Sequence, residues 1–406
     1  MRRRQFIKGS GLAIASALSL ENNLFGRRES KAESNFKHFV FINLQGAPSH
    51  LEMFDPKPKH KNGGPTKTVK TKTDGLIFAE DFGRLAEISD KMAVMRMTST
   101  DRNHGTAQQF LQYGAVRTLG AASNRPTMGA MAAHTMSKGK DSGLPTYVNM
   151  GGSQSQGGFL GNNYSSFSVN PGSAGQDFAV AAALKDKIRK ADGIRQKLRE
   201  MSPYGESEIY NEEIKNQKSS LYVIDNGEKI FDINLETAAT QGKYNGQYGQ
   251  HFLLTKRLIA NGVNSLQINI GGWDTHSNNF VTCASKVGDL DIAIDALVKD
   301  LIEMEKFDQT LIMICGEFGR TPTINESEGR DHFSNVYTAA FISGGIRGGQ
   351  VFGESSKDGY KINNGISREQ LCHSAMSLLG TPARFEEKNK APERLLPAGF
   401  GIPDFS

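Results

Sequence analysis

Residues 265–276 read Ser-Leu-Gln-Ile-Asn-Ile-Gly-Gly-Trp-Asp-Thr-His. The run over 265–270 has the length of a strand, and the two glycines that follow it end the strand. Before this run, residues 249–261 have the spacing of an amphipathic helix, and Gly262 supplies the usual C-terminal stop. The same helix-then-strand unit repeats at 287–305 and 310–315. This alternation predicts a mainly parallel sheet with helices on both faces.

Other segments extend the predicted sheet. Residues 39–44 form a continuous apolar run of the kind found in strands that are covered on both faces, and the run ends at Gly46. Further strands are expected at 93–97 and 339–343. Helices are expected at 83–91, 106–114 and 369–379. The sequence therefore predicts an α/β fold with a mainly parallel central sheet.

Some segments depart from this alternation. Residues 57–74 are rich in Lys, Thr, Gly and Pro and predict a surface loop, whereas 151–175 predicts an irregular segment or lid. The charged stretches 185–201 and 206–219 have helical spacing. They predict solvated helices of an insertion at residues 180–245.

The first 32 residues differ in charge from the rest of the chain. They hold seven basic and two acidic side chains, which accounts for the whole formal net charge of +5. The remainder is neutral, so we expect no nucleic-acid-binding surface. Arg2, Arg3 and Arg4 precede a moderately apolar run over 9–20, which is too short for a stable transmembrane span.

This order of features resembles a twin-arginine export signal over residues 1–32. The resemblance implies the twin-arginine translocase as a partner and a periplasmic or extracellular location. One large α/β domain with its insertion is then expected over 33–406. The sequence leaves open whether the signal is cleaved or kept as an anchor.

The three cysteines, Cys283, Cys315 and Cys372, are too few and too scattered for a disulfide framework or a cysteine-based zinc site. Cys315 lies inside an apolar strand pattern and is expected in the core. A metal site in this chain would have to use histidines and carboxylates.

Carboxylates and imidazoles follow the predicted strands, where the functional groups of parallel α/β sheets collect. They are flanked by glycines, which allow close backbone approach. This ligand mix suits zinc, manganese, calcium or a similar divalent ion. The predicted metal ligands are Asp274, His276, Glu317, Asp331 and His332.

Arg320 is expected beside this site, because a guanidinium group binds tetrahedral oxyanions through paired hydrogen bonds. The alternative is that these residues only stabilise loops. In that case Asp274 caps a helix and Asp331 pairs with Arg330.

The motifs resemble a known family. The runs Gly-Gly-Trp-Asp-Thr-His, Gly-Glu-Phe-Gly-Arg-Thr-Pro, Gly-Arg-Asp-His and Gly-Gly-Ile-Arg-Gly-Gly are similar to those of the exported domain-of-unknown-function family 1501. The segment 46–58 is also similar to that family. The family is grouped by fold with alkaline phosphatases, sulfatases and phosphomutases. The resemblance implies an alkaline phosphatase-like fold, a divalent metal and chemistry on phosphate or sulfate esters.

Carried over by position, Asp274 and His276 resemble the middle metal-binding pair of the superfamily. Glu317 resembles the start of the later pair, and His332 resembles the final histidine. Two departures stand out. Phe318 replaces the imidazole expected next to Glu317, and the first strand exit offers Ser49, His50, Glu52 and Asp55 in place of an immediate aspartate. One metal, or an altered pair, is therefore expected.

The turn at 98–105 occupies the place of the superfamily's covalent nucleophile. Thr100 and Asn103 resemble the threonine and asparagine of nucleotide pyrophosphatase relatives, which implies a nucleophile and an oxyanion donor. The alternative is that one of them caps the helix that opens at Thr106. No sulfatase-type formylglycine motif is present in the sequence.

The remaining aromatic candidates are less specific. His50 and His104 are second-tier site candidates. Trp273, the only tryptophan, either stacks on a sugar ring or packs to fix its loop. The other histidines are expected at the surface (His38, His60) or in packed or surface positions on helices (His134, His251, His373).

Together these features favour an exported metal-dependent hydrolase of phosphate or sulfate esters, including small-molecule and glycan esters. The alternative is a non-catalytic periplasmic or surface binding protein that retains the fold and a partial metal site. A phosphomutase or transferase is a third candidate, but it would need a phosphorylated substrate outside the cytoplasm.

Overall fold

The computed structural model describes residues 34–114, 124–137, 143–152, 155–175, 177–178, 185–200, 208–382, 384–385, 393–394 and 405. The predicted export signal at 1–32 lies outside these ranges. Within them, no helix is long and apolar enough to cross a membrane.

The centre of the sheet is β1 (His38–Leu44), flanked by β7 (Ser265–Ile270) and β8 (Thr310–Gly316). Both neighbours run parallel to β1. Every residue of the three strands is buried, which explains why β1 and β8 read as nearly continuous apolar runs. β7 instead alternates, and its buried Gln267 and Asn269 bond to each other and to residues of β5. The predicted positions of the three central strands are confirmed.

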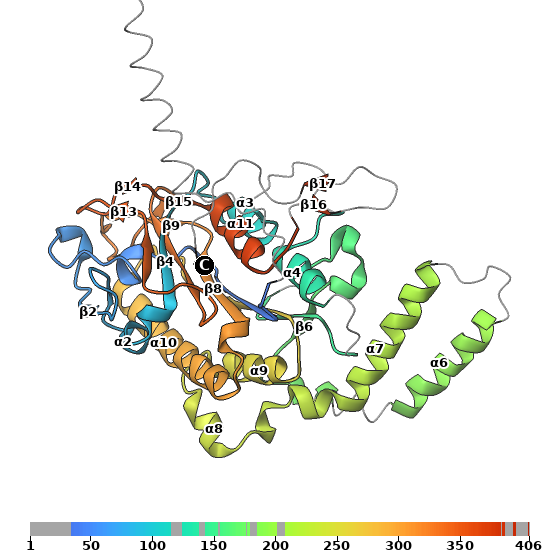
Figure 1. Ribbon diagram of the computed structural model, residues 1–406. Coiled ribbons are helices and arrows are strands. Elements are labelled where there is room, and N and C mark those ends of the chain that lie inside the picture. The colour runs from blue at the N-terminus through green and yellow to red at the C-terminus, as the bar shows by residue number, and fades with distance from the viewer. Residues whose placement is uncertain are drawn as a thin grey trace, which may run out of the picture.

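The sheet extends on both sides of this centre (Figure 1). Beyond β7 lie β5 (Tyr147–Met150) and β6 (Phe167–Val169), both parallel. Beyond β8 lies β11 (Tyr337–Ile342), which is antiparallel to β8 and to the next strand, β4 (Met92–Thr98). The strands β12 (Gln350–Phe352) and β15 (Ile366–Ser367) pair with β4 in parallel.

Among the described residues this makes a nine-stranded, mostly parallel sheet, which confirms the predicted fold class. The direction of β11 is the exception. No helix lies between β8 and β11, so the chain turns at the edge of the sheet and comes straight back.

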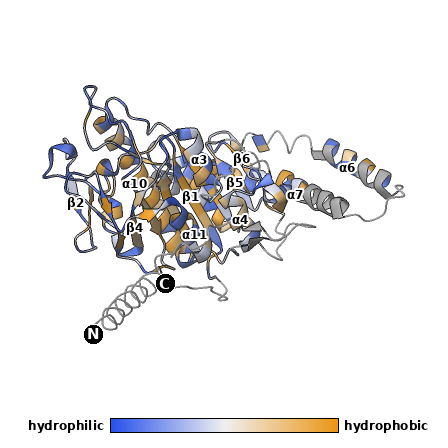
Figure 2. Cartoon of the chain, turned by 90° about the horizontal axis from the view of Figure 1, so that it is seen from above, coloured by the Kyte–Doolittle hydropathy of each residue, from blue (hydrophilic) through white to orange (hydrophobic). Residues whose placement is uncertain are grey.

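Helices cover both faces of the sheet, as predicted. β1 sends Val40 and Ile42 into one core, with α2 (Gly83–Ala86), α9 (Gly249–Ala260) and α10 (Asn279–Glu303). It sends Phe39 and Phe41 into a second core on the other face, with α4 (Met128–Met136) and α11 (Arg368–Leu378). Figure 2 shows hydrophobic residues concentrated in these central elements.

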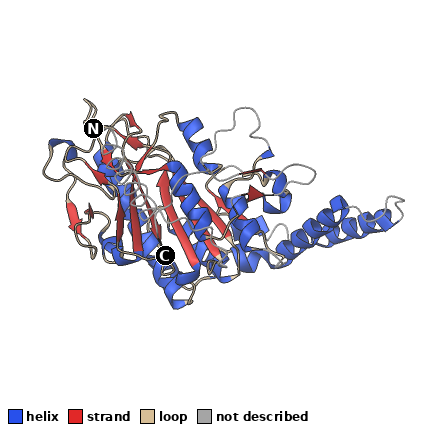
Figure 3. Cartoon of the chain, turned by 45° about the horizontal axis from the view of Figure 1, so that its top comes forward, coloured by secondary structure: helices blue, strands red, loops and turns tan. Residues whose placement is uncertain are grey.

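The charged helices form as predicted. The helices α6 (Lys185–Glu200) and α7 (Glu208–Phe231) project together away from the sheet (Figure 3). The remaining helices are α3 (His104–Gln112) and α8 (Ala238–Lys243), with short 3-10 turns at His50–Glu52, Lys61–Gly63, Ser89–Lys91, Gly158–Leu160, Asn162–Tyr164, Ile233–Leu235 and Phe307–Gln309. The remaining strands are β2 (Thr68–Lys70), β3 (Ile77–Ala79), β9 (Gly319–Arg320), β10 (His332–Phe333), β13 (Glu354–Ser355), β14 (Ile362–Asn363), β16 (Arg384–Phe385) and β17 (Glu393–Arg394).

Three predictions need correction. The expected surface loop at 57–74 contains β2, which pairs with β3. The expected irregular segment at 151–175 contains β6, a short edge strand. The sequence pattern missed it because serines and asparagines surround its three residues. His38 was expected at the surface but is buried, because it begins β1 and its Nδ1 bonds to the carbonyl of Val263 at 2.7 Å.

Candidate metal centre

The predicted polar loops gather at one edge of the sheet. The strands β1, β7 and β8 are parallel, so their C-terminal ends reach the same edge. Because β11 returns antiparallel to β8, the loop between them also stays at that edge. Within this loop β9 pairs with β10, which sets Arg320 opposite His332. The loops after β7 and β8 together carry Asp274, His276, Glu317, Arg320, Asp331 and His332.

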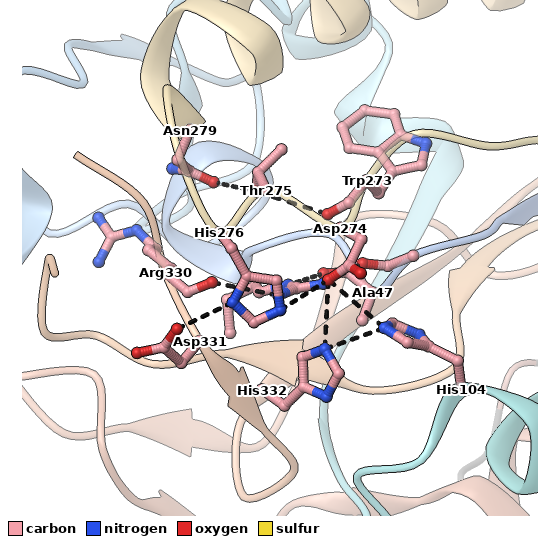
Figure 4. A network of polar contacts seen from close by, with 12 residues as sticks. Ala47, His104, Trp273, Asp274, Thr275, His276, Asn279, Arg330, Asp331 and His332 are labelled. Atoms are coloured by element: carbon pink, nitrogen blue, oxygen red, sulfur yellow. Dashed lines mark hydrogen bonds and ion pairs between the residues drawn. The ribbon is translucent and has the colours of Figure 1, made fainter. Parts of the chain in front are cut away.

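Asp274 lies at the centre of the site (Figure 4). Its Oδ1 atom is 3.0 Å from Nε2 of His276, 3.2 Å from Nε2 of His332 and 3.4 Å from Nε2 of His104. The third imidazole comes from the first turn of α3. The side chain of Asp274 is 47% exposed, so the cluster is open to a ligand from solvent.

The second ring nitrogen of each imidazole, Nδ1, donates a hydrogen bond to an oxygen atom. A carbonyl or ionised carboxylate oxygen only accepts, so a neutral ring that satisfies this contact carries its proton on Nδ1 and presents a lone pair at Nε2. The acceptors are Asp331 Oδ1 for His276 (2.9 Å), the Arg102 carbonyl for His332 (2.9 Å) and Glu317 Oε1 for His104 (2.6 Å).

The lone pairs of His104 and His332 face each other. Their Nε2 atoms are 3.0 Å apart, and both lie within 3.4 Å of Asp274 Oδ1. Such a group of acceptors repels itself unless a cation or a proton lies among them. Imidazole nitrogen and carboxylate oxygen are ligands of zinc and related ions, and an anchored Nδ1–H is the usual companion of a metal-binding histidine. His104, Asp274 and His332 could therefore hold a divalent cation.

Glu317 supports this cluster from behind. It is buried, and its Oε1 accepts from the backbone N–H of Gly46 (3.0 Å) as well as from His104. Its Oε2 accepts from Nε2 of Gln108 (2.8 Å), whose Oε1 in turn accepts from Asn43 (3.1 Å). The hydrogen bond that His104 donates to Glu317 raises the pKa of His104. Glu317 was predicted to be a metal ligand. In the structure it instead positions the imidazole of His104 and lies outside the group that could hold the ion.

Asp331 has the equivalent position behind His276. Its side chain is 58% exposed, and the hydrogen bond from His276 lowers the pKa of Asp331. The geometry therefore gives Asp331 a supporting contact in place of the predicted metal ligation. His276 directs its Nε2 at Asp274, but this nitrogen also accepts from Arg320 at 3.3 Å, so metal ligation by His276 stays a prediction.

Arg320 is fully buried, and all five of its N–H groups are used. No donor is left for a substrate, so the predicted oxyanion-binding role needs correction. Burial opposes ionisation of Asp274, but the hydrogen bond and charge of Arg320 outweigh it and lower the pKa of Asp274 to about 2. The acceptors are the carbonyls of Ala47 (2.9 Å), Arg330 (3.1 Å) and Gly46 (2.6 Å), Nε2 of His276 (3.3 Å) and Oδ1 of Asp274.

The loop-stabilising alternative expected Arg330 to pair with Asp331, but the structure shows no such pair. Arg330 is fully buried and binds both carboxylate oxygens of Glu52, at 3.1 and 2.7 Å. Its other donors go to the carbonyls of Thr321 and Asn62, at 3.2 and 2.7 Å, and to that of Pro322. Nor does Asp274 cap a helix, because α10 begins at Asn279 with Asn278 as its N-cap.

The first strand exit contributes backbone and no metal ligand. Its polar side chains, Ser49, His50, Glu52 and Asp55, are all buried and bonded elsewhere. Gly46 has a φ of 111°, and a Cβ there would lie 2.5 Å from the backbone nitrogen of Asp274. This close approach lets the N–H of Gly46 reach Glu317 and its carbonyl reach Arg320.

The predicted nucleophile and oxyanion donor lie on the turn before α3. Asn103 is the N-cap of that helix, and its Oδ1 accepts from the backbone N–H of Thr106 at 3.1 Å. Its side-chain oxygen therefore caps the helix, which is what the capping alternative expected. Thr100 is exposed and makes no hydrogen bond to the described residues.

Trp273 packs and does not stack on a ligand. Its side chain is fully buried, and the ammonium group of Lys286 lies 5.6 Å from the ring centroid. The interpretation as a sugar platform is therefore wrong. Cys315, predicted in the core, is buried.

Sequence reasoning ranked His104 too low and missed Arg102 and Gln108. His104 and Gln108 are four residues apart, so they share one face of α3. This four-residue spacing, just after the strand predicted at 93–97, was the signal in the sequence that could have found them. Arg102 is exposed, and its terminal nitrogens make no hydrogen bond to the described residues, although its guanidinium lies 5.6 Å from the ring of Phe333.

The family model "Protein of unknown function (DUF1501)" matches residues 36–395. The match covers most of the chain, and the protein belongs to this family, as its motifs predicted. No curated protein matches the sequence.

Solved structures of the alkaline phosphatase type are similar to this chain at low levels. A protein of the alkaline phosphatase superfamily from Vibrio parahaemolyticus is 11% identical, with a TM-score of 0.40 over 87% of this chain and 68% of its own. PsFucS1 sulfatase from Pseudoalteromonas sp. is 11% identical, with a TM-score of 0.39 over 94% of this chain and 72% of its own. A TAB5 alkaline phosphatase mutant with bound Mg is 12% identical, with a TM-score of 0.37 over 86% of this chain and 100% of its own. These TM-scores are too low to transfer an activity or a ligand to this chain.

Proposed function

We propose that this protein is an exported metal-dependent hydrolase of phosphate or sulfate esters. One observation carries the proposal: the Nε2 atoms of His276, His332 and His104 converge on one oxygen of Asp274, at 3.0 to 3.4 Å. In the neutral form each imidazole can present its Nε2 lone pair while Nδ1 donates to a fixed oxygen. A site preorganised in this way needs no rearrangement to take a cation.

His104, Asp274 and His332 would hold the ion, with His276 beside them. A divalent ion bound there supplies a Lewis acid for an ester oxygen and lowers the pKa of a water molecule. Zinc, manganese and calcium are the candidate ions. Arg320 holds Asp274 ionised, and Glu317 holds the ring of His104.

Arg102 replaces Arg320 as the proposed contact for the substrate anion. Its carbonyl accepts from His332, its Nε donates to Ser334 at 3.4 Å, and its exposed terminal nitrogens have no hydrogen-bond partner among the described residues. Thr100 stays the proposed nucleophile and Asn103 the proposed oxyanion donor through its amide N–H groups. Residues 1–32 are proposed to direct export through the twin-arginine translocase to the periplasm or beyond.

Metal analysis of the purified protein tests the proposal. We expect about one divalent ion per chain in the wild type, and loss of that ion in Asp274→Asn and His332→Ala. Asp90→Asn is the matched control, because it makes the same change at an exposed carboxylate. A wild type that takes up no zinc, manganese or calcium after reconstitution would sink the proposal.

An ester panel tests the reaction itself. Aryl phosphates, phosphodiesters and aryl sulfates are incubated with the metal-loaded wild type and with Thr100→Ala. Hydrolysis that survives Thr100→Ala removes this residue as nucleophile and assigns the attack to water.

A non-catalytic binding protein is the second candidate, favoured by Phe318. This side chain is fully buried and packs against the rings of His104 and His332, with centroids 4.8 and 5.1 Å apart. An apolar wall thus closes one side of the cluster. Stoichiometric metal without hydrolysis of any ester in the panel supports this candidate over the hydrolase.

A further inference from the structure

A pocket of about 400 Å³ opens on the same edge of the sheet as the candidate metal centre. It lies where β5 and β6 end, beside the first turn of α9. This volume falls at the lower end of the range for ligand pockets, roughly 300–1,000 Å³. The lining residues are Gly151, Gly152, Ser168, Val169, Asn170, Pro171 and His251.

The pocket adjoins the strand that leads to Asp274. β5 pairs directly with β7, and a Cβ on Gly151 would lie 2.6 Å from the backbone oxygen of Asn269 in that strand. A Cβ on Gly152 would lie 2.6 Å from the side-chain nitrogen of Asn269. Neighbouring strands are ~4.8 Å apart, so the pocket begins about 5 to 10 Å along the edge from the exit of β7.

The chemistry of the pocket wall is neutral. None of the described residues that line it is Asp, Glu, Lys or Arg. Burial lowers the pKa of His251, so the imidazole is uncharged at neutral pH. The Nδ1 of His251 is buried away from the pocket, and its Nε2 lies on the side of Gly151, 3.7 Å from the position of a Cβ there. The described wall therefore offers no charge to bind a second anion.

Two further lining groups can donate hydrogen bonds. Asn170 uses its Oδ1 to accept from the backbone N–H of Gly172 at 3.1 Å, which leaves its NH₂ group free. Ser168 presents an exposed hydroxyl. Val169 and Pro171 add small apolar surfaces. Short apolar patches next to neutral donors and acceptors complement a sugar ring, which has C–H faces and hydroxyl edges.

We propose that this pocket binds a sugar ring, and that the substrate is a phosphate or sulfate ester of a carbohydrate. The statement about the ester rests on the proposed function, whereas the binding of an uncharged sugar does not. The ring would occupy the pocket formed by β5, β6 and α9, and the ester group would reach Asp274 and its histidines.

Direct binding is the first test. Glucose, galactose, mannose, lactose and maltose are each titrated onto the full protein, with saturation-transfer NMR as the readout. We expect at least one sugar to bind the wild type. Ser168→Trp, which places a large side chain at an exposed position of the wall, abolishes the signal. Asn170→Asp keeps the acceptor for Gly172 but replaces the NH₂ donor, and it weakens binding about fivefold.

Asp274→Asn is the control for this experiment, because it changes the metal cluster and leaves the pocket intact. Sugar binding in this variant should equal that of the wild type. Thermal unfolding of each variant shows that it is folded. No binding of any of the five sugars by the wild type, or binding that Ser168→Trp leaves unchanged, overturns the proposal.

The kinetic test separates this inference from the proposed function. For a sugar phosphate or sulfate that the wild type hydrolyses, Ser168→Trp should raise KM at least about tenfold, while KM for an aryl ester stays the same. Equal effects on both esters contradict the sugar pocket. Sugar binding without hydrolysis of any ester retains the pocket and refutes the hydrolase.

Discussion

Replacing Glu317 by glutamine tests whether the buried carboxylate prepares His104 for a metal. Glu317 accepts three hydrogen bonds, from Gly46, His104 and Gln108. A glutamine has one acceptor oxygen. If that oxygen faces Gly46 and His104, the new NH₂ group meets the NH₂ group of Gln108, donor against donor. The variant therefore loses one buried hydrogen bond and the charge that holds the Nδ1 proton of His104.

Loss of a supporting partner of this kind weakens metal affinity by about 10- to 100-fold, or about 1.4 to 2.7 kcal/mol. We expect Glu317→Gln to raise the zinc dissociation constant by that factor, measured by competition with a chromophoric chelator. Glu80→Gln is the control, since Glu80 is exposed and, within the described part of the chain, forms an ion pair with the exposed Lys67 alone. The double variant Glu317→Gln with Gln108→Glu restores the donor–acceptor match, and it should recover part of the affinity. Wild-type zinc affinity in a folded Glu317→Gln protein would refute the reasoning.

Three further predictions follow from single residues. Gly46→Ala should destabilise the fold by more than about 2 kcal/mol in urea unfolding, because a Cβ would lie 2.5 Å from the Asp274 nitrogen. Gly75→Ala, with positive φ but open space, should cost only about 1 kcal/mol; equal losses would contradict the steric argument. Burial lowers the pKa of His50 from 6.5 to about 4. The unfolded chain therefore binds this proton first, and stability should fall by about 3 kcal/mol as pH drops from 6.5 to 4. His50→Gln should remove that part of the pH dependence of urea unfolding; an unchanged profile would count against it. Arg102→Ala should raise KM for anionic esters about tenfold and leave the metal content unchanged, with partial recovery in Arg102→Lys; loss of metal would instead indicate a structural role.

The central strands could be predicted because burial on both faces leaves a direct trace in the sequence. Residues 39–44 and 310–315 are apolar runs for that reason, whereas 265–270 alternates polar and apolar residues and was placed by the helix pattern before it and the two glycines after it. The direction of β11 left no such trace, since a strand has the same composition in either direction. Direction is set by the connection, and the loop from 317 to 336 contains no helix to carry the chain back across the sheet.

The candidate site was only partly readable for a related reason. Asp274, His276 and His332 follow strands directly, and the rule of strand exits finds them. His104 follows β4, which lies two positions from β8 with β11 between them. Its approach to Glu317 depends on that strand order, which no local pattern reveals.

The roles of Arg320 and Arg330 were hidden too, because their partners are mostly backbone carbonyls. Any residue presents a carbonyl, so the sequence cannot indicate which ones an arginine will meet. What distinguishes the two arginines is that neither has exposed surface, a property of the folded chain.

This use of carbonyls has a consequence for how the protein can vary. Six donors of Arg320 and Arg330 end on the main chain of Ala47, Gly46, Arg330, Thr321, Pro322 and Asn62. The bonds are indifferent to the side chains at those positions but not to the path of the chain between them. The six bonds therefore depend on loop length, and inserting or deleting a single residue in these loops should abolish the site. Side-chain changes act on it only through other contacts, such as the packing of the buried Ala47 or the hydrogen bond from Asn62 to the Asp358 carbonyl.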